Sequence, residues 1–77
     1  MHLDIITPDK KLFSGEVTSV LVPGTAGQFQ VLNNHAAIIS TLIKGKVVIK
    51  TKEGEKFFEV KSGVIEVLKN NIVVLVE

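Results

Sequence analysis

Residues 23–45, PGTAGQFQVLNNHAAIISTLIKG, form the least repetitive part of this 77-residue chain. A loop with a glycine at each end, Gly24 to Gly27, leads into a short strand over residues 28–32. A polar corner follows at residues 33–35, and then a largely apolar run over residues 36–43. Periodicity alone leaves strand and helix open for this run, but its β-branched residues and flanking turns favour a strand. If the protein has a specific partner surface, we expect it at this loop and corner.

Short β segments lie on both sides of this stretch. Glycines 45, 54 and 63 follow one another at nine-residue intervals, which is the repeat length of a β-meander. Strands at this spacing, with a turn signal in each gap, predict an all-β sandwich or barrel and require no helix. Besides those in the opening stretch, the expected strands cover residues 3–6, 10–13, 16–22, 46–52, 56–60, 64–68 and 72–76, with turns at 53–54, 62–63 and 70–71.

The expected strands differ in how their apolar residues are distributed. The strand 46–52 alternates Val47 and Ile49 with lysines, which indicates one buried face and one solvated face. The strands 36–43, 64–68 and 72–76 carry apolar residues on both faces. Either these strands are central and covered on both sides, or one face is a docking surface for another subunit. The sequence leaves both interpretations open.

Composition excludes several classes of function. The chain is long enough for one domain only. It has no cysteine, which removes disulfides and Cys-based metal sites and fits a reducing compartment. It also has no arginine and a net charge of only +1, so direct nucleic-acid binding is not expected. No apolar run approaches the ~20 residues of a membrane span, so we expect membrane contact only through other proteins.

Catalytic and ligand-binding patterns are missing as well. The four serines have only His2 and His35 as possible bases, and no paired acidic motif is present. The Gly24 to Gly27 loop lacks the lysine and hydroxyl of a phosphate-binding loop. We therefore expect no catalytic, cofactor or metal site, and we interpret His35 as a corner residue that hydrogen-bonds the backbone. A small enzyme with His35 in a pocket is a distant alternative to a scaffold or binding role.

The order of these features resembles the epsilon subunit of F-type ATP synthases. The resemblance covers essentially the whole chain and implies a single domain, residues 1–77, built as a flattened sandwich of about ten short, mostly antiparallel strands in two sheets. The motifs that carry it are the opening HLDIITP (2–8) with LFSG (12–15), then G-x-x-G (24–27), FQVL (29–32), NNHA (33–36), LIKG (42–45), GVIEV (63–67) and Asn70-Asn71.

The resemblance also implies a function without an active site. Such a domain is a non-catalytic part of the central stalk, which binds the gamma subunit and sits on the membrane rotor ring of c subunits. It helps to couple proton or sodium flow to ATP synthesis at the cytoplasmic face of the bacterial inner membrane. By position, the residues implied to approach the ring are Thr25, Ala26, Gly27 and Gln28, and those on the gamma side are Thr7, His35 and Ser40. Ala26 and Gln28 stand where acidic residues are common, so an ion pair with the ring is not expected.

Most relatives continue beyond the sandwich into two helices, whereas this chain ends at Glu77. We expect a naturally short subunit without the C-terminal helical domain, although a truncated one is the open alternative. In either case the chain should not inhibit ATP hydrolysis by helix extension. From another class of function, the competing hypothesis is a free-standing β-sandwich adaptor, unrelated to ATP synthase, that binds its partner through residues 24–45.

Overall fold

The computed structural model describes all of residues 1–77 and contains nine strands and no helix. The all-β prediction is confirmed, with nine strands where about ten were expected. No element of the structure is a helix that could cross a membrane. The strands are β1 (His2–Ile6), β2 (Lys11–Glu16), β3 (Ser19–Gly24), β4 (Gly27–Leu32), β5 (Ile38–Leu42), β6 (Gly45–Thr51), β7 (Gly54–Val60), β8 (Gly63–Leu68) and β9 (Asn71–Val76).

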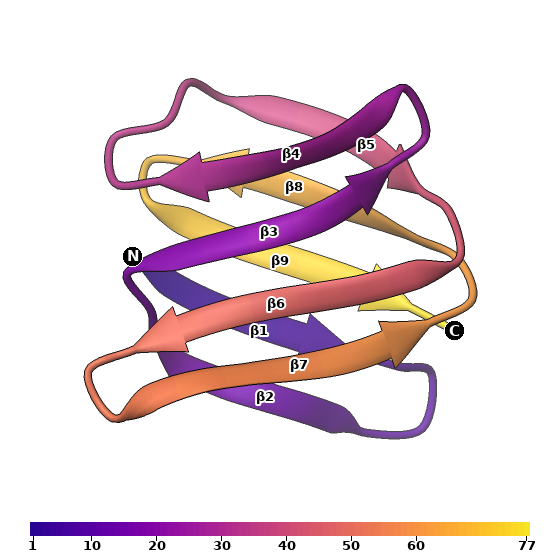
Figure 1. The fold of residues 1–77 in the computed structure, drawn as a ribbon, viewed down its shortest axis with the longest axis horizontal. Coiled ribbons are helices and arrows are strands. Elements are labelled where there is room, and N and C mark those ends of the chain that lie inside the picture. The colour runs from indigo at the N-terminus through magenta and orange to yellow at the C-terminus, as the bar shows by residue number, and fades with distance from the viewer.

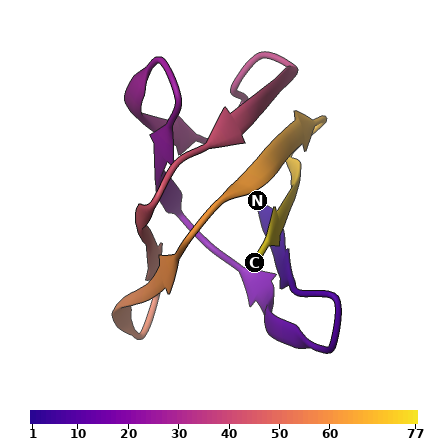
Figure 2. The same cartoon turned by 90° about the vertical axis from the view of Figure 1, so that its right-hand side faces the viewer.

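The strands form two layers that face each other (Figures 1 and 2). The front layer of Figure 1 has the order β4-β3-β6-β7, and the back layer has the order β2-β1-β9-β8-β5. The two layers are not separate sheets, because one backbone pair, Gly24 with Leu42, links β3 to β5 and makes the hydrogen-bonded path continuous. All neighbouring strands are antiparallel except β1 and β9. The predicted two-sheet sandwich is therefore one sheet folded over onto itself.

The change of partner along β3 is the point at which the layers join. Ser19–Leu21 pair with β6, whereas Gly24 pairs with β5. Pro23 lies between these contacts and has no N–H to donate to a sheet ladder. Its carbonyl instead accepts a hydrogen bond of 2.9 Å from the amide of Ile43, just after β5. Pro23 thus lets β3 leave β6 and meet β5.

Fifteen buried apolar side chains fill the space between the layers. They follow the period of two expected for strands with one inner face. Val47 and Ile49 on β6 are fully buried while Lys46 and Lys50 are exposed, which confirms the prediction for residues 46–52. The remaining core residues are Leu3, Ile5, Val17, Val20, Val22, Val31, Leu42, Val60, Ile65, Val67, Ile72, Val74 and Val76.

Several predicted boundaries are wrong. The strand expected over 36–43 covers only Ile38–Leu42. Ser14-Gly15 does not end a strand, because Gly15 pairs with Leu3 and β2 continues to Glu16, so β3 starts at Ser19 rather than residue 16. The turns expected at 53–54, 62–63 and 70–71 each lie one residue earlier. Lys69 and Asn70 have φ values of 50° and 62°, the left-handed pair that a two-residue hairpin turn requires.

Candidate partner-binding surfaces

Thr25 and Ala26 form a two-residue turn between β3 and β4, at the right-hand end of the molecule in Figure 1. Gly27 follows with φ of 137°, a conformation that favours glycine. A Cβ at Gly24 would lie only 2.7 Å from the carbonyl oxygen of Gly27, so this end of the turn also requires glycine. Thr25, Ala26, Gly27 and Gln28 are all exposed, and the structure places these predicted residues together in the protruding β3–β4 turn and the first two residues of β4.

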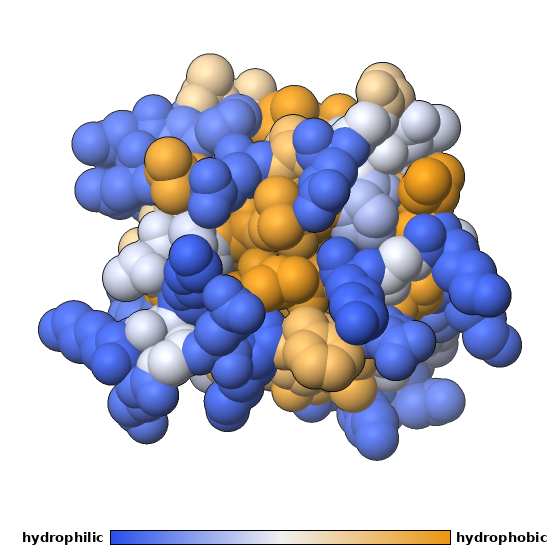
Figure 3. Space-filling model, viewed as in Figure 1, coloured by the Kyte–Doolittle hydropathy of each residue, from blue (hydrophilic) through white to orange (hydrophobic).

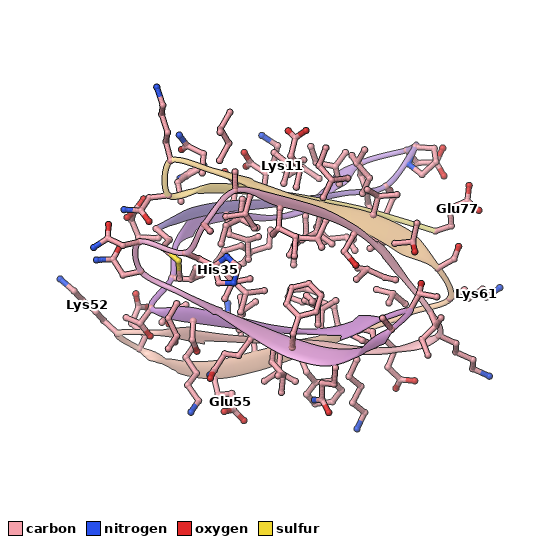
Figure 4. The ribbon with its side chains drawn as sticks, turned by 90° about the horizontal axis from the view of Figure 1, so that it is seen from above. Lys11, His35, Lys52, Glu55, Lys61 and Glu77 are labelled. Atoms are coloured by element: carbon pink, nitrogen blue, oxygen red, sulfur yellow. The ribbon has the colours of Figure 1, made fainter.

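The corner after β4 is held by two asparagines. Asn34, with φ of 64°, donates its amide to Oδ1 of Asn70 at 2.8 Å, and Nδ2 of Asn70 donates back to Oδ1 of Asn34 at 3.3 Å. The His35 amide donates to the Leu32 carbonyl at 3.1 Å, and its Nδ1 lies 2.7 Å from the Ala36 carbonyl. Figure 4 shows the half-buried imidazole between the two layers at the β4–β5 edge. The interpretation of His35 as a backbone-bonded corner residue is confirmed.

The outer face of the back layer carries an exposed apolar surface. Ile39 on β5 is 71% exposed, Leu68 on β8 is 54% exposed and Leu75 on β9 is 50% exposed. Val64 lies on the same face because it pairs with Leu75, and the half-buried Val73 lies there because it is two residues from Leu75 on β9. The exposed Glu66 stands between Ile39 and Val73 in the strand register, so one carboxylate interrupts this apolar surface. The interpretation that these strands are covered on both sides is therefore wrong. The docking-surface interpretation fits, since clusters of exposed apolar side chains mark interaction sites.

An open groove of about 710 Å³ lies at one end of this face. The register aligns Ile6, Leu75, Val64 and Thr41 in one row across four strands, and Thr7 follows directly after that row. Thr7 and Thr41 both line the groove. The Thr7 hydroxyl is held within its own turn, because it donates to the Lys10 carbonyl and accepts from the Lys10 amide, both at 3.0 Å.

The three residues predicted to face gamma do not form one cluster. Thr7 lies in the groove at one end of the sheet, and His35 lies at the corner near the opposite end. Ser40 falls on the side of β5 that also carries the buried Leu42, whereas the adjacent Thr41 faces the groove. The exposed residues of the back-layer face, Ile39 above all, were not among the predicted site residues, although the docking-surface interpretation covered these strands. Their signal was present in the apolar residues on both faces of these strands.

The outer face of the front layer has a narrower apolar band. Leu21, Val48 and Phe57 lie side by side across β3, β6 and β7, and Figure 3 shows apolar surface in the middle of this face between polar groups. Phe57 is exposed, with the Lys46 ammonium 4.6 Å from its ring centroid, at the distance of a cation–π contact. Lysine thus covers part of the band that would otherwise be exposed.

The charged groups that lie close together are on β1 and β2. Asp4 lies 3.4 Å from Nε2 of His2 and 3.5 Å from Nζ of Lys11. The polar side chain of Ser14, directly opposite Asp4 across the strand pair, lowers the pKa of Asp4 below its ordinary value of 3.8. Desolvation opposes this shift, and the charges of Lys11 and His2 add to it. Asp4 thus contacts His2 on its own strand and Lys11 on β2, and no group of three or more His, Asp or Glu side chains in the chain could hold a metal ion.

The structure is thus an all-β domain with an exposed turn, a polar corner and an exposed apolar sheet face. The chain belongs to the family described as "ATP synthase, Delta/Epsilon chain, beta-sandwich domain", whose sequence profile matches residues 1–77. This membership confirms the resemblance inferred from the motifs and the expectation of a subunit without catalytic activity. It excludes the alternative of an adaptor unrelated to ATP synthase.

Similar proteins span a range of lengths. The chain is 43% identical over 76 residues to an ATP synthase epsilon chain of Chlorobium limicola and covers 86% of its length. It is 39% identical over 77 residues to that of Caulobacter vibrioides, covering 90%, and 39% identical to that of Leptospira borgpetersenii, covering only 61%. This chain therefore accounts for most of the first two relatives and for less than two thirds of the third.

Solved structures with the same fold come from ATP synthases. A chain in the cryo-EM structure of Euglena gracilis mitochondrial ATP synthase, OSCP/F1/c-ring, superposes with a TM-score of 0.88 at 17% identity, covering 96% of this chain and 48% of that one. A chain in the central stalk/c-ring structure of Tetrahymena thermophila mitochondrial ATP synthase superposes with a TM-score of 0.83, also at 17% identity, covering 97% and 61%. At this identity the likeness establishes the fold.

Proposed function

We propose that this chain is a non-catalytic central-stalk component of an F-type ATP synthase, which joins the gamma subunit to the ring of c subunits. In this role it couples proton or sodium movement through the membrane to ATP synthesis. It lies at the cytoplasmic face of the bacterial inner membrane and touches the membrane only through the complex. The observation that carries the proposal is the presence, on one continuous folded sheet, of an exposed polar turn and a separate exposed apolar face.

We assign the turn to the ring. Its residues Thr25, Ala26, Gly27 and Gln28 carry no charge, so the contact depends on shape and hydrogen bonds. The turn protrudes from the end of the sandwich, which suits a contact with the polar loops of a second protein. The absence of charge also makes the contact sensitive to an introduced ion, because a buried charge without a partner is costly.

A charge placed on this turn tests the assignment. Ala26→Arg should weaken binding of the chain–gamma complex to purified c-ring at least tenfold, because it places an unpaired cation in the contact. Glu53→Arg is the matched control, since Glu53 occupies the other hairpin turn that precedes a positive-φ glycine, at the opposite end of the molecule. Circular dichroism should show both variants folded. Wild-type ring binding by Ala26→Arg would remove the assignment.

We assign the gamma subunit to the back-layer side, where Thr7 lines the groove and Ile39, Leu68 and Leu75 are exposed. His35 at the corner after β4, and Ser40 on the inner side of β5, lie apart from this face, and we propose them as a second, separate part of the gamma contact. An apolar face of this kind favours a partner with apolar side chains, because docking removes both surfaces from water. A stable one-to-one complex with isolated gamma, measured by light scattering, is the expected result. Failure to form that complex would contradict this half of the proposal.

A further inference from the structure

The turn assigned to the ring is fastened to the end of β5. The Thr25 amide donates to the Thr41 carbonyl at 3.0 Å, beside the Gly24–Leu42 pair that joins the layers. The hydroxyls of Thr25 and Thr41 lie 2.6 Å apart, the shortest hydrogen bond of any side chain in the structure. The side chain of a β5 residue therefore reaches the turn between β3 and β4, sixteen residues away in the sequence.

Thr41 also belongs to the other proposed contact surface. It lines the groove on the outer face of the back layer together with Thr7 and Val64. The Thr41 side chain thus hydrogen-bonds the turn assigned to the ring and also lines the groove assigned to gamma. No other residue that lines the groove makes a side-chain hydrogen bond to the turn between β3 and β4.

Both hydroxyls are exposed, which decides what their bond can do. When the protein hydrogen bond is broken, water can replace it at each oxygen, so its net contribution to folding is small. Its effect on conformation is local. It selects one rotamer of Thr25 and restricts the turn at the residue next to Ala26, and such preorganisation reduces the entropy lost on binding.

We propose that Thr41 is a positioning residue for ring attachment, which holds the turn in its binding conformation through the Thr25 hydroxyl and connects the two contact surfaces of the domain. This inference rests on the proposed function, because it takes the turn to be the ring contact. The inference extends the proposed ring contact to Thr41, a residue outside the turn. The role of Thr41 depends on one atom, its hydroxyl oxygen.

Thr41→Val removes the hydroxyl and keeps the shape of the side chain, and Thr41→Ser keeps the hydroxyl and removes the methyl group. We expect Thr41→Val to weaken c-ring binding of the chain–gamma complex about fivefold, because the turn loses the side-chain hydrogen bond that restricts it before binding. Exchange of the Thr25 amide, which is hydrogen-bonded to the Thr41 carbonyl, should rise with it. Thr41→Ser should match the wild type in both measurements.

A double-mutant cycle makes the inference specific to the hydroxyl pair. Thr25→Val should produce the same increase in turn exchange as Thr41→Val, and the double variant should show no further increase. This exchange measurement needs no ring, and unchanged exchange at the amides of the core strands shows that each variant is folded. Unchanged exchange and ring binding in Thr41→Val, or equal loss in Thr41→Ser, would overturn the inference. Ring binding by Ala26→Arg at wild-type strength, with turn exchange raised in Thr41→Val, would instead refute the ring assignment alone.

Discussion

Replacing Ile39 with alanine tests whether the back-layer face binds gamma. The Ile39 side chain is 71% exposed, so docking can still remove most of its surface from water. Full burial of an isoleucine side chain contributes about 1.5–3 kcal/mol, and the exposed share of that corresponds to about 1–2 kcal/mol. Ile39→Ala should therefore weaken the complex with gamma by roughly 5- to 30-fold. The free energy of unfolding should change by less than about 0.5 kcal/mol, because the Ile39 side chain contributes little to the core packing.

Ile65→Ala is the matched control, since the same truncation on the adjacent strand β8 removes a fully buried side chain. It should cost about 2–5 kcal/mol of unfolding free energy. At a temperature where it is folded, its affinity for gamma should equal that of the wild type. Isothermal titration calorimetry with isolated gamma and urea denaturation measure the two quantities. Equal affinities of wild type and Ile39→Ala would refute the reasoning, as would a large loss of stability in Ile39→Ala.

Three further predictions concern the fold itself. Gly63→Ala should destabilise the domain by about 1–3 kcal/mol in urea denaturation, because the added Cβ would overlap the carbonyl oxygen of Leu75; an unchanged midpoint would contradict this. Asn70→Gly keeps the positive-φ turn but loses both hydrogen bonds to the corner after β4, so stability should fall by about 1 kcal/mol and amide exchange in that corner should rise. Folding lowers the pKa of Asp4, so its carboxylate stabilises the fold above about pH 3.8, and this contribution is lost as the pH falls through the folded-state pKa. NMR titration should place the Asp4 midpoint below 3.8 and should show it rising in Ser14→Ala; an unchanged midpoint in that variant would exclude the hydroxyl as the cause.

The fold class could be predicted because local signals agree with one another. The alternation of Val47 and Ile49 with lysines fixes which face of β6 is buried, and Gly54 marks its hairpin. Signals of this kind depend only on residues close in sequence. The exposed turn at residues 25–26 was found for the same reason, since the glycines at both of its ends are required by local backbone geometry.

Features set by long-range pairing could not be read in this way. Thr7 and Thr41 line one groove only because β9 and β8 lie between β1 and β5 in the sheet order. Ser14-Gly15 has the composition of a turn, yet pairing with β1 keeps it extended. Strand order likewise decides that Ile39 faces solvent, because no third layer covers the back of the sheet.

The most direct test of the central claim is assembly from purified parts. The chain, gamma and detergent-solubilised c-ring are mixed, and the mass and composition of the product are measured by native mass spectrometry. We predict one copy of this chain with one gamma on one ring, and loss of the ring but not of gamma in Ala26→Arg. A ring that binds gamma equally well without this chain, or a chain that binds neither protein, would contradict it.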